Sequence, residues 1–145
     1  MKSIKIIIAA LLAFAATGCA TTATPPDEVK EAPRQNIYLN NYTASPDFIR
    51  IIVTRDQGYA GHACSAGVYI DGRLAAKLDT SERVTFWMPP KEVLVGVGPA
   101  ERTGFCSAGL GMREVATNPK AGETRMFRVV VRPGDGLGIE ATSGR

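Results

Sequence analysis

A chain of 145 residues, of which 45% are hydrophobic and 21% charged, is long enough for one folded domain with its own core. Its 17 lysines and arginines against 14 acidic residues give a net charge of +3, and the basic residues neither cluster in a run nor alternate with aromatic residues. This pattern is unlike the basic surface of a nucleic-acid-binding protein, so we expect no nucleic-acid partner.

The first 18 residues have the three parts of a secretory signal. Lys2 and Lys5 make a basic start, residues 6–16 form an unbroken apolar run, and residues 17–19 (TGC) close it. The apolar run is too short to cross a bilayer as a helix of the mature protein. We therefore expect residues 1–18 to be a signal peptide whose removal leaves 15 basic and 14 acidic residues, because both lysines leave with it.

The tetrapeptide at residues 16–19 (ATGC) resembles the lipobox of bacterial lipoproteins. The resemblance implies that the Cys19 thiol is diacylated and becomes the new N-terminus, so that acyl chains anchor the protein at about 0.8 kcal/mol per buried methylene. Ala20 follows, and in lipoproteins of enteric bacteria the absence of aspartate there implies transport to the outer membrane, where we expect the domain to face the periplasm. The alternative is an ordinary secretory signal that leaves Cys19 as an unmodified thiol.

Residues 20–35 are rich in threonine, proline and charge, and Val29 is their only large apolar residue. Such a segment buries too little surface to offset the entropy that it loses on ordering. We therefore expect residues 19–35 to consist of the lipidated cysteine and a flexible linker, which would span on the order of 20–25 Å. The folded domain would then comprise residues 36–145 and stand clear of the membrane.

From residue 36 onward the pattern is that of short β-strands. Residues 48–54 (FIRIIVT) are dense in β-branched side chains and predict a central strand covered on both faces. Asp71-Gly72 predicts a hairpin turn and Pro89-Pro90 the end of a strand. The further strands predicted in this way are 68–71, 74–78, 83–88, 92–98, 125–132 and 137–141.

Alternation within these strands predicts one face directed at a core. The inward set is Val84, Phe86, Met88, Val93, Val95, Val97, Phe127, Val129 and Val131. Trp87 lies on the opposite face of its strand. Because no segment has a sustained helical period and glycine or proline separates the short strands, we expect an all-β fold, a small antiparallel β-sandwich or a small barrel.

Residues 69–72 (YIDG) and 86–90 (FWMPP) carry a second resemblance. Together with the apolar return strand between them and the valine-rich strand that follows, they resemble PEGA-type domains and a related group of small bacterial lipoproteins of unknown function. The resemblance covers about 30 residues. It implies a prealbumin-like sandwich and, because its motifs mark turns, it implies no active site.

Cys64 and Cys106 each begin the same tetrapeptide, Cys-Ser-Ala-Gly. An even pair of cysteines in a small exported domain favours a disulfide, which would stabilise the fold by roughly 3–4 kcal/mol in the loop-entropy model. The small residues beside the cysteines would let two backbones approach closely.

Three other chemistries would use the same residues. His62, Cys64 and Cys106 could hold a metal, but such a site needs further ligands and His62 is the sole histidine. A Cys–His nucleophilic pair needs an unpaired thiol, and a redox-active pair is usually spaced Cys-x-x-Cys. Gly109-Leu110-Gly111 lacks the strand and helix of a phosphate loop, and Ser65 lacks a nucleophile elbow. We expect no catalytic residue, metal or cofactor, and no enzymatic activity.

Glycine-rich loops with aromatic side chains flank both cysteines. Tyr59 and His62 lie in the first loop, and Arg102 and Phe105 lie in the second. Loops on a rigid scaffold are where binding residues gather, so these four residues are candidates for partner binding. The alternative, which we favour at this stage, is that Tyr59, Phe105 and Trp87 cover a second layer of the sandwich.

These observations predict a lipid-anchored β-domain of the cell envelope that acts as a non-catalytic binding or accessory module for an envelope protein or glycan. One alternative is a structural or assembly lipoprotein that works by protein–protein contact along a sheet edge. Another is an inhibitor of an envelope hydrolase such as lysozyme, which would insert a loop bearing His62, Arg102 or Phe105 into a cleft.

Overall fold

The structure is a computed structural model that describes residues 20–39, 43–58, 61–107 and 111–143. The expected signal peptide, the acylation site Cys19 and the candidate Tyr59 lie outside the described residues.

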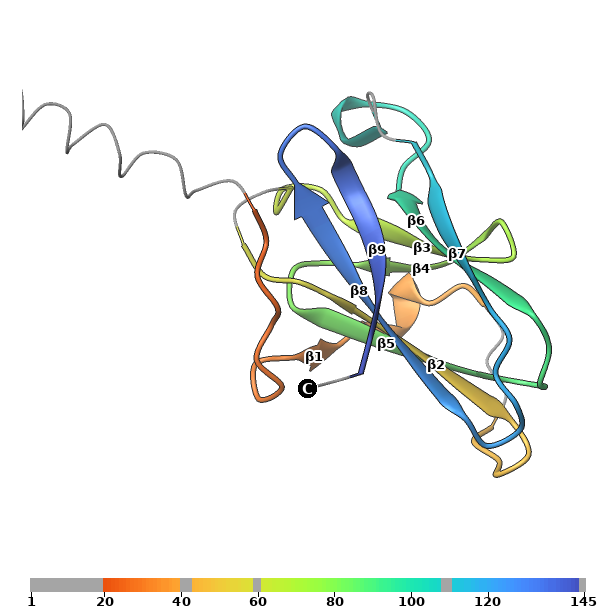
Figure 1. The fold of residues 1–145 in the computed structure, drawn as a ribbon. Helices are drawn as coiled ribbons and strands as arrows, with labels where there is room; N and C mark the ends of the chain where they lie inside the picture. The colour runs from red at the N-terminus through yellow and green to blue at the C-terminus, as the bar shows by residue number, and fades with distance from the viewer. Residues whose placement is uncertain (1–19, 40–42, 59–60, 108–110, 144–145) are drawn as a thin grey trace, which may run out of the picture.

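Two β-sheets pack face to face (Figure 1). One has five strands in the order β1-β5-β2-β8-β9, and the other has four in the order β4-β3-β6-β7. Two 3-10 helices, η2 (Arg34–Asn36) and η3 (Phe105–Ser107), join the strands. The strands are β1 (Lys30–Glu31), β2 (Ile49–Arg55), β3 (Ala66–Ile70), β4 (Arg73–Leu78), β5 (Glu82–Met88), β6 (Val93–Pro99), β7 (Arg113–Thr117), β8 (Thr124–Arg132) and β9 (Gly136–Thr142).

The pairing confirms the predicted β-sandwich. All neighbours are antiparallel except β1 with β5 and β2 with β8, which run parallel. The alternative of a small barrel is not realised, because among the described residues the two sheets stay separate and each keeps two edge strands. The seven strands predicted from the sequence all exist, with ends that lie within two residues of the predicted ones.

The core lies between the two sheets and confirms the predicted inward face. Eight of the nine predicted inward side chains are buried, and Val131 is half-buried against them. The central strand β2 contributes Ile49, Ile51 and Val53 to this core, and Ile52 on its other face is also buried. Burial of each large apolar side chain contributes about 1.5–3 kcal/mol, so this cluster is the main source of stability.

The predicted hairpin turn joins β3 to β4. Asp71 and Gly72 have φ angles of 50° and 73°, the left-handed conformation that a two-residue hairpin requires and that glycine adopts without steric cost. The backbone N–H of Leu94 donates to the Asp71 carboxylate at 3.0 Å, and Lys91 forms an ion pair with the same carboxylate. The Asp71 side chain therefore ties the hairpin to the start of β6.

The N-terminal segment differs from the flexible linker expected over residues 19–35. The Thr21 N–H donates to the Val131 carbonyl at 3.2 Å, and Thr22 forms an isolated bridge with Gln57. The Thr24 hydroxyl donates to the Arg55 carbonyl at 3.1 Å. Further along, β1 pairs with β5 and Ala32 is buried. Composition is misleading here because a polar segment bound by backbone hydrogen bonds needs little apolar surface, and the domain therefore begins near residue 21 rather than 36.

Candidate functional site at the disulfide-linked end

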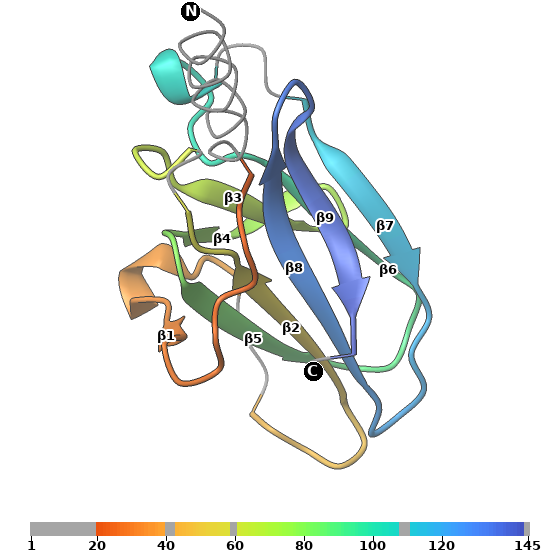
Figure 2. The ribbon, with the colours of Figure 1, turned by 60° about the vertical axis from the view of Figure 1, so that its left-hand side comes forward.

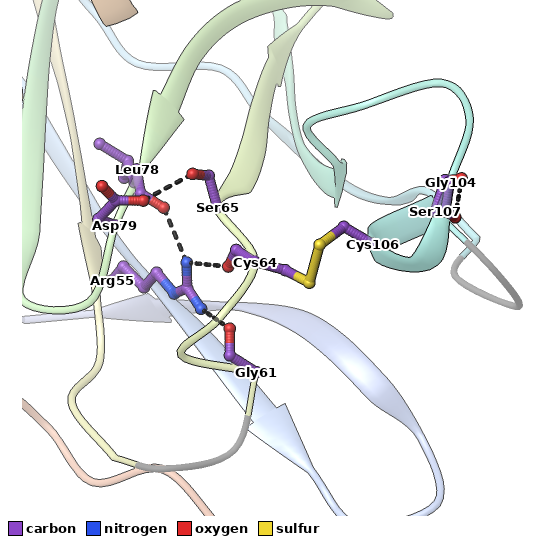
Figure 3. Close-up of a disulfide and its surroundings, with 9 residues drawn as sticks. All are labelled: Arg55, Gly61, Cys64, Ser65, Leu78, Asp79, Gly104, Cys106 and Ser107. Atoms are coloured by element: carbon purple, nitrogen blue, oxygen red, sulfur yellow. Dashed lines mark hydrogen bonds between the residues drawn. A yellow bond between two sulfur atoms is a disulfide. The ribbon is translucent and has the colours of Figure 1, made fainter.

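A disulfide between Cys64 and Cys106 joins two loops at one end of the sandwich (Figure 3). Cys64 precedes β3, Cys106 lies in η3 after β6, and their α carbons are 5.5 Å apart. The predicted pairing is thus confirmed. Two bonded sulfurs are neither thiolate ligands nor nucleophiles, and the described part of the chain contains no group of three His, Cys, Asp or Glu side chains placed to hold a metal.

Arg55, the last residue of β2, holds the first of these loops. Its side chain reaches inward to the loop and is only 2% exposed. One terminal nitrogen donates to the carbonyls of Cys64 at 2.7 Å and Leu78 at 2.8 Å, and the other donates to the carbonyl of Gly61 at 2.6 Å (Figure 3). A single guanidinium therefore connects the loop before β3 to the end of β4.

The Arg55 guanidinium with its three carbonyl acceptors is called the clamp below. Burial of the guanidinium determines the electrostatics of this clamp. Desolvation lowers the pKa of the Arg55 guanidinium, and the nearby carboxylates of Asp79 and Glu82 act in the opposite direction. The arginine stays charged, so its three hydrogen bonds are charge-assisted and stronger than neutral ones. Sequence reasoning missed Arg55, and the available signal was a second arginine, after Arg50, at the end of a strand rich in β-branched apolar residues.

Two serine side chains form further hydrogen bonds in the two loops. The Ser65 hydroxyl donates to the Asp79 carboxylate at 2.6 Å. In the second loop, the N–H and the hydroxyl of Ser107 both donate to the Gly104 carbonyl, at 3.2 and 2.9 Å (Figure 3). The described residues of the two loops are therefore held both by the disulfide and by their own hydrogen bonds.

A second pair of charged residues lies beside the clamp. Asp56 is 1% exposed, and Arg128 donates to both of its carboxylate oxygens, with Nε at 3.0 Å. The hydrogen bond from Arg128 to Asp56 raises the pKa of the guanidinium. Because this pair joins the residue after β2 to β8, it is a structural contact of the five-stranded sheet.

The structure brings three of the four predicted binding residues to one end of the molecule. His62 is exposed in the first loop, and Arg102 and Phe105 are exposed in the second. Phe105 is 89% exposed, the most exposed large hydrophobic side chain among the described residues. The interpretation that the aromatic residues cover a second layer is therefore wrong for Phe105.

Trp87 has a different environment from Phe105. It is half-buried on the outer face of the five-stranded sheet, and the Arg50 guanidinium lies 5.6 Å from its ring centroid. Arg50 and Trp87 are also direct cross-strand neighbours, so a cation–π contact covers this face. Here the favoured interpretation of a covering aromatic is consistent with the structure.

An open hollow of about 640 Å³ lies beside the first loop and is lined by Gly58, His62, Ala63, Asp79 and Thr80. Its lining carries one imidazole, of His62, and one carboxylate, of Asp79, which accepts a hydrogen bond from the Ser65 hydroxyl.

No family model, curated protein or solved structure matches this chain, so the fold and the geometry of this end carry the functional argument. Within the described ranges, no helix has the length and apolar character needed to span a membrane.

Proposed function

We propose that this protein is a lipid-anchored, non-catalytic binding module of the bacterial cell envelope, and that it makes contact through its disulfide-linked end. One observation carries the proposal: Phe105 is 89% exposed on a loop that the Cys64–Cys106 disulfide holds in place. A large aromatic side chain on a preorganised loop loses little conformational entropy on binding, which is the usual character of an interface anchor.

The lipid anchor rests on the residues before Cys19 and agrees with the disulfide. A basic start, an apolar run and the tetrapeptide ATGC direct a chain to export and acylation. A disulfide persists in an oxidising compartment such as the periplasm. Intact-mass measurement of the purified protein tests both points, since the proposal expects acyl chains on Cys19 and no free thiol at Cys64 or Cys106.

The contact surface is tested by photo-crosslinking in whole cells. A photoreactive amino acid at Phe105 should form adducts, whereas the same amino acid at Ala121, an exposed turn residue at the other end of the molecule, should not. Phe105→Ala should leave thermal unfolding unchanged, because the ring is exposed. A large loss of stability in this variant would instead place the ring in the core and overturn the proposed contact surface.

A second candidate function is inhibition of an envelope hydrolase such as lysozyme. Phe105 and Arg102 are exposed on the same loop, and an inhibitor could insert this loop into an active-site cleft. Purified protein in molar excess should then abolish lysozyme activity. Unchanged activity at that ratio would remove this candidate and leave the binding module.

A further inference from the structure

We infer that the disulfide-linked end rests on the membrane that holds the acyl chains of Cys19, with the Phe105 ring inserted among the lipid headgroups. This inference rests on the proposed acylation and names the partner of the proposed contact surface as the lipid bilayer. It follows from where the described chain begins, from which end of the sandwich lies beside that point, and from the side chains at that end.

The first step is the position of the anchor. Thr21 is fixed to β8 by the hydrogen bond from its N–H to the Val131 carbonyl and by the bond from the Val131 N–H to its hydroxyl, at 2.9 Å. Only Ala20 separates Thr21 from Cys19. Because one residue spans at most about 3.6 Å, the α carbon of Cys19 lies within about 7 Å of that of Thr21. The acyl chains therefore leave the protein next to its folded surface, with no linker between.

The second step is that this point lies at the disulfide-linked end. A Cβ atom on Gly58 would lie 3.2 Å from the Thr21 α carbon, so the chain start touches the base of the first loop. That loop leads to Cys64, which is bonded to Cys106 beside Phe105. In Figures 1 and 2, the start of the described chain, the turn between β8 and β9 and the short teal helix η3 lie at the same end of the sandwich.

The third step is the chemistry of that end. Phe105 is almost fully exposed and Arg102 is exposed three residues before it. The neighbouring Glu101 forms an ion pair with Lys77, which compensates its charge. Asp135 in the β8–β9 turn is an exposed acid at the same end, and its carbonyl accepts from Arg113. An apolar ring such as that of phenylalanine can be buried at the boundary between the headgroups and the acyl chains, and a guanidinium binds phosphate through paired hydrogen bonds.

These three steps favour lipid over a protein as the occupant. An anchor held within about 7 Å of the domain keeps this end at the bilayer surface, where a protein partner would have to displace the headgroups to reach Phe105. Insertion of the Phe105 ring adds a second membrane contact beside the acyl chains, and burial of its apolar surface adds to the membrane affinity. The opposite end, which carries Pro89, Pro90 and Ala121, is then directed away from the membrane.

Depth-dependent fluorescence quenching tests the inference on the full acylated protein. Phe105→Trp and the matched control Ala121→Trp are each made in a Trp87→Phe background and reconstituted in vesicles of equal parts phosphatidylethanolamine and phosphatidylglycerol. Lipids that carry a bromine or nitroxide near the headgroup should quench the indole at position 105 strongly and the indole at position 121 weakly. The emission from position 105 should also shift to the blue when vesicles are added.

The same samples separate failure of the inference from failure of the proposed function. Intact mass establishes whether Cys19 is acylated. Acylated protein with equal quenching at the two positions overturns the membrane contact and leaves Phe105 to a protein partner, whereas unacylated protein overturns the anchored module itself. Hydrogen exchange on the unaltered acylated protein gives a second measurement that needs no tryptophan variant. With vesicles present, the backbone amides of residues 101–107 should exchange more slowly in the acylated protein than in the Cys19→Ser protein. The amides of residues 118–123 should exchange at the same rate in both proteins.

Discussion

Thr21 and Val131, which are 110 residues apart in the sequence, exchange two hydrogen bonds. The Thr21 N–H donates to the Val131 carbonyl, and the Val131 N–H donates to the Thr21 hydroxyl at 2.9 Å. This pair attaches the start of the described chain to the last hairpin of the sandwich. These two hydrogen bonds make the segment that follows the expected lipidation site part of the folded domain.

Thr21→Pro should lower the free energy of unfolding by about 2 kcal/mol, because it removes the N–H donor and the hydroxyl acceptor and leaves two β8 groups without their partners. Ala23→Pro is the matched control, since Ala23 is exposed and none of the described hydrogen bonds uses its N–H. Urea denaturation of the two variants measures the difference. A flexible linker would give equal stability for Thr21→Pro, Ala23→Pro and the wild type.

Arg55→Met should destabilise the protein by about 3 kcal/mol, because three carbonyls at the disulfide-linked end lose their donor. Arg55→Lys should recover only part of this loss, since an ammonium group cannot reproduce the planar fork of a guanidinium. Thermal unfolding gives the ranking. Equal stability of the methionine and lysine variants would show that the charge-assisted hydrogen bonds contribute little.

Replacing Cys64 and Cys106 together by alanine should cost roughly 3–4 kcal/mol, because the bridge closes a loop with a sequence separation of 42 residues in the unfolded chain. Each single replacement should cost about as much as the double replacement, as both break the same bond. Chemical denaturation under oxidising conditions checks this, with the reduced wild type as the reference. If reduction left the midpoint unchanged, the disulfide would not contribute to stability.

The stability contributed by Asp71 should depend on pH. Burial acts to raise the pKa of Asp71, but the hydrogen bonds from Lys91 and from the Leu94 N–H, together with the charge of Lys91, outweigh it and lower the pKa from 3.8. A carboxylate with a lowered pKa stabilises the folded state above its ordinary pKa, and this contribution is lost as the pH falls through the lowered value.

Asp71→Asn isolates this effect, because asparagine tolerates the positive φ and keeps an acceptor for Leu94 while losing the charge. The wild type should be more stable near neutral pH, by no more than about 1 kcal/mol since the ion pair is solvent-exposed. The difference should shrink as the pH is lowered below 3.8. Unfolding curves at several pH values measure it, and a difference that widened in acid would contradict the assigned direction.

Replacing Arg128 should lower the free energy of unfolding more than replacing its partner Asp56. Arg128→Met leaves a buried carboxylate without its partner and should cost about 3 kcal/mol or more. Asp56→Asn keeps an acceptor for the partly exposed guanidinium and should cost about 1 kcal/mol. A double-mutant cycle by urea denaturation determines the coupling energy. Similar costs for the two single variants would show that burial of Asp56 is not the controlling factor.

Much of the fold could be predicted because apolar and polar side chains alternate along most of its strands, and the others are dense in β-branched residues. Val84, Phe86 and Met88 reveal the inward face of β5 without any other information. The strand β7 was missed because Val115 is its only inward aliphatic side chain of any size and the rest is exposed or small. The two-residue β1 was missed because Lys30 and Glu31 pair through backbone groups that the sequence pattern does not report.

The candidate site was predictable only in part. The disulfide followed from the two cysteines that remain once Cys19 is assigned to acylation, and the two loops were found by their composition. The clamp by Arg55 was not predictable, because its acceptors come from Gly61, Cys64 and Leu78, which only the tertiary fold brings together. The exposure of Phe105 was not predictable either, since an aromatic residue in a glycine-rich loop is compatible with both a covering and a protruding position.

The parallel pairing of β2 with β8 also determines when the chain can finish folding. β2 is the most apolar strand of the five-stranded sheet. Along one edge it pairs with β8, which lies near the end of the sequence, and the paired residues run from Arg50 opposite Thr124 to Arg55 opposite Val129. A nascent or truncated chain that stops before residue 124 therefore presents an unpaired apolar edge to any neighbouring chain. Such fragments are expected to aggregate, and C-terminal deletions that remove β8 should reduce the yield of soluble protein.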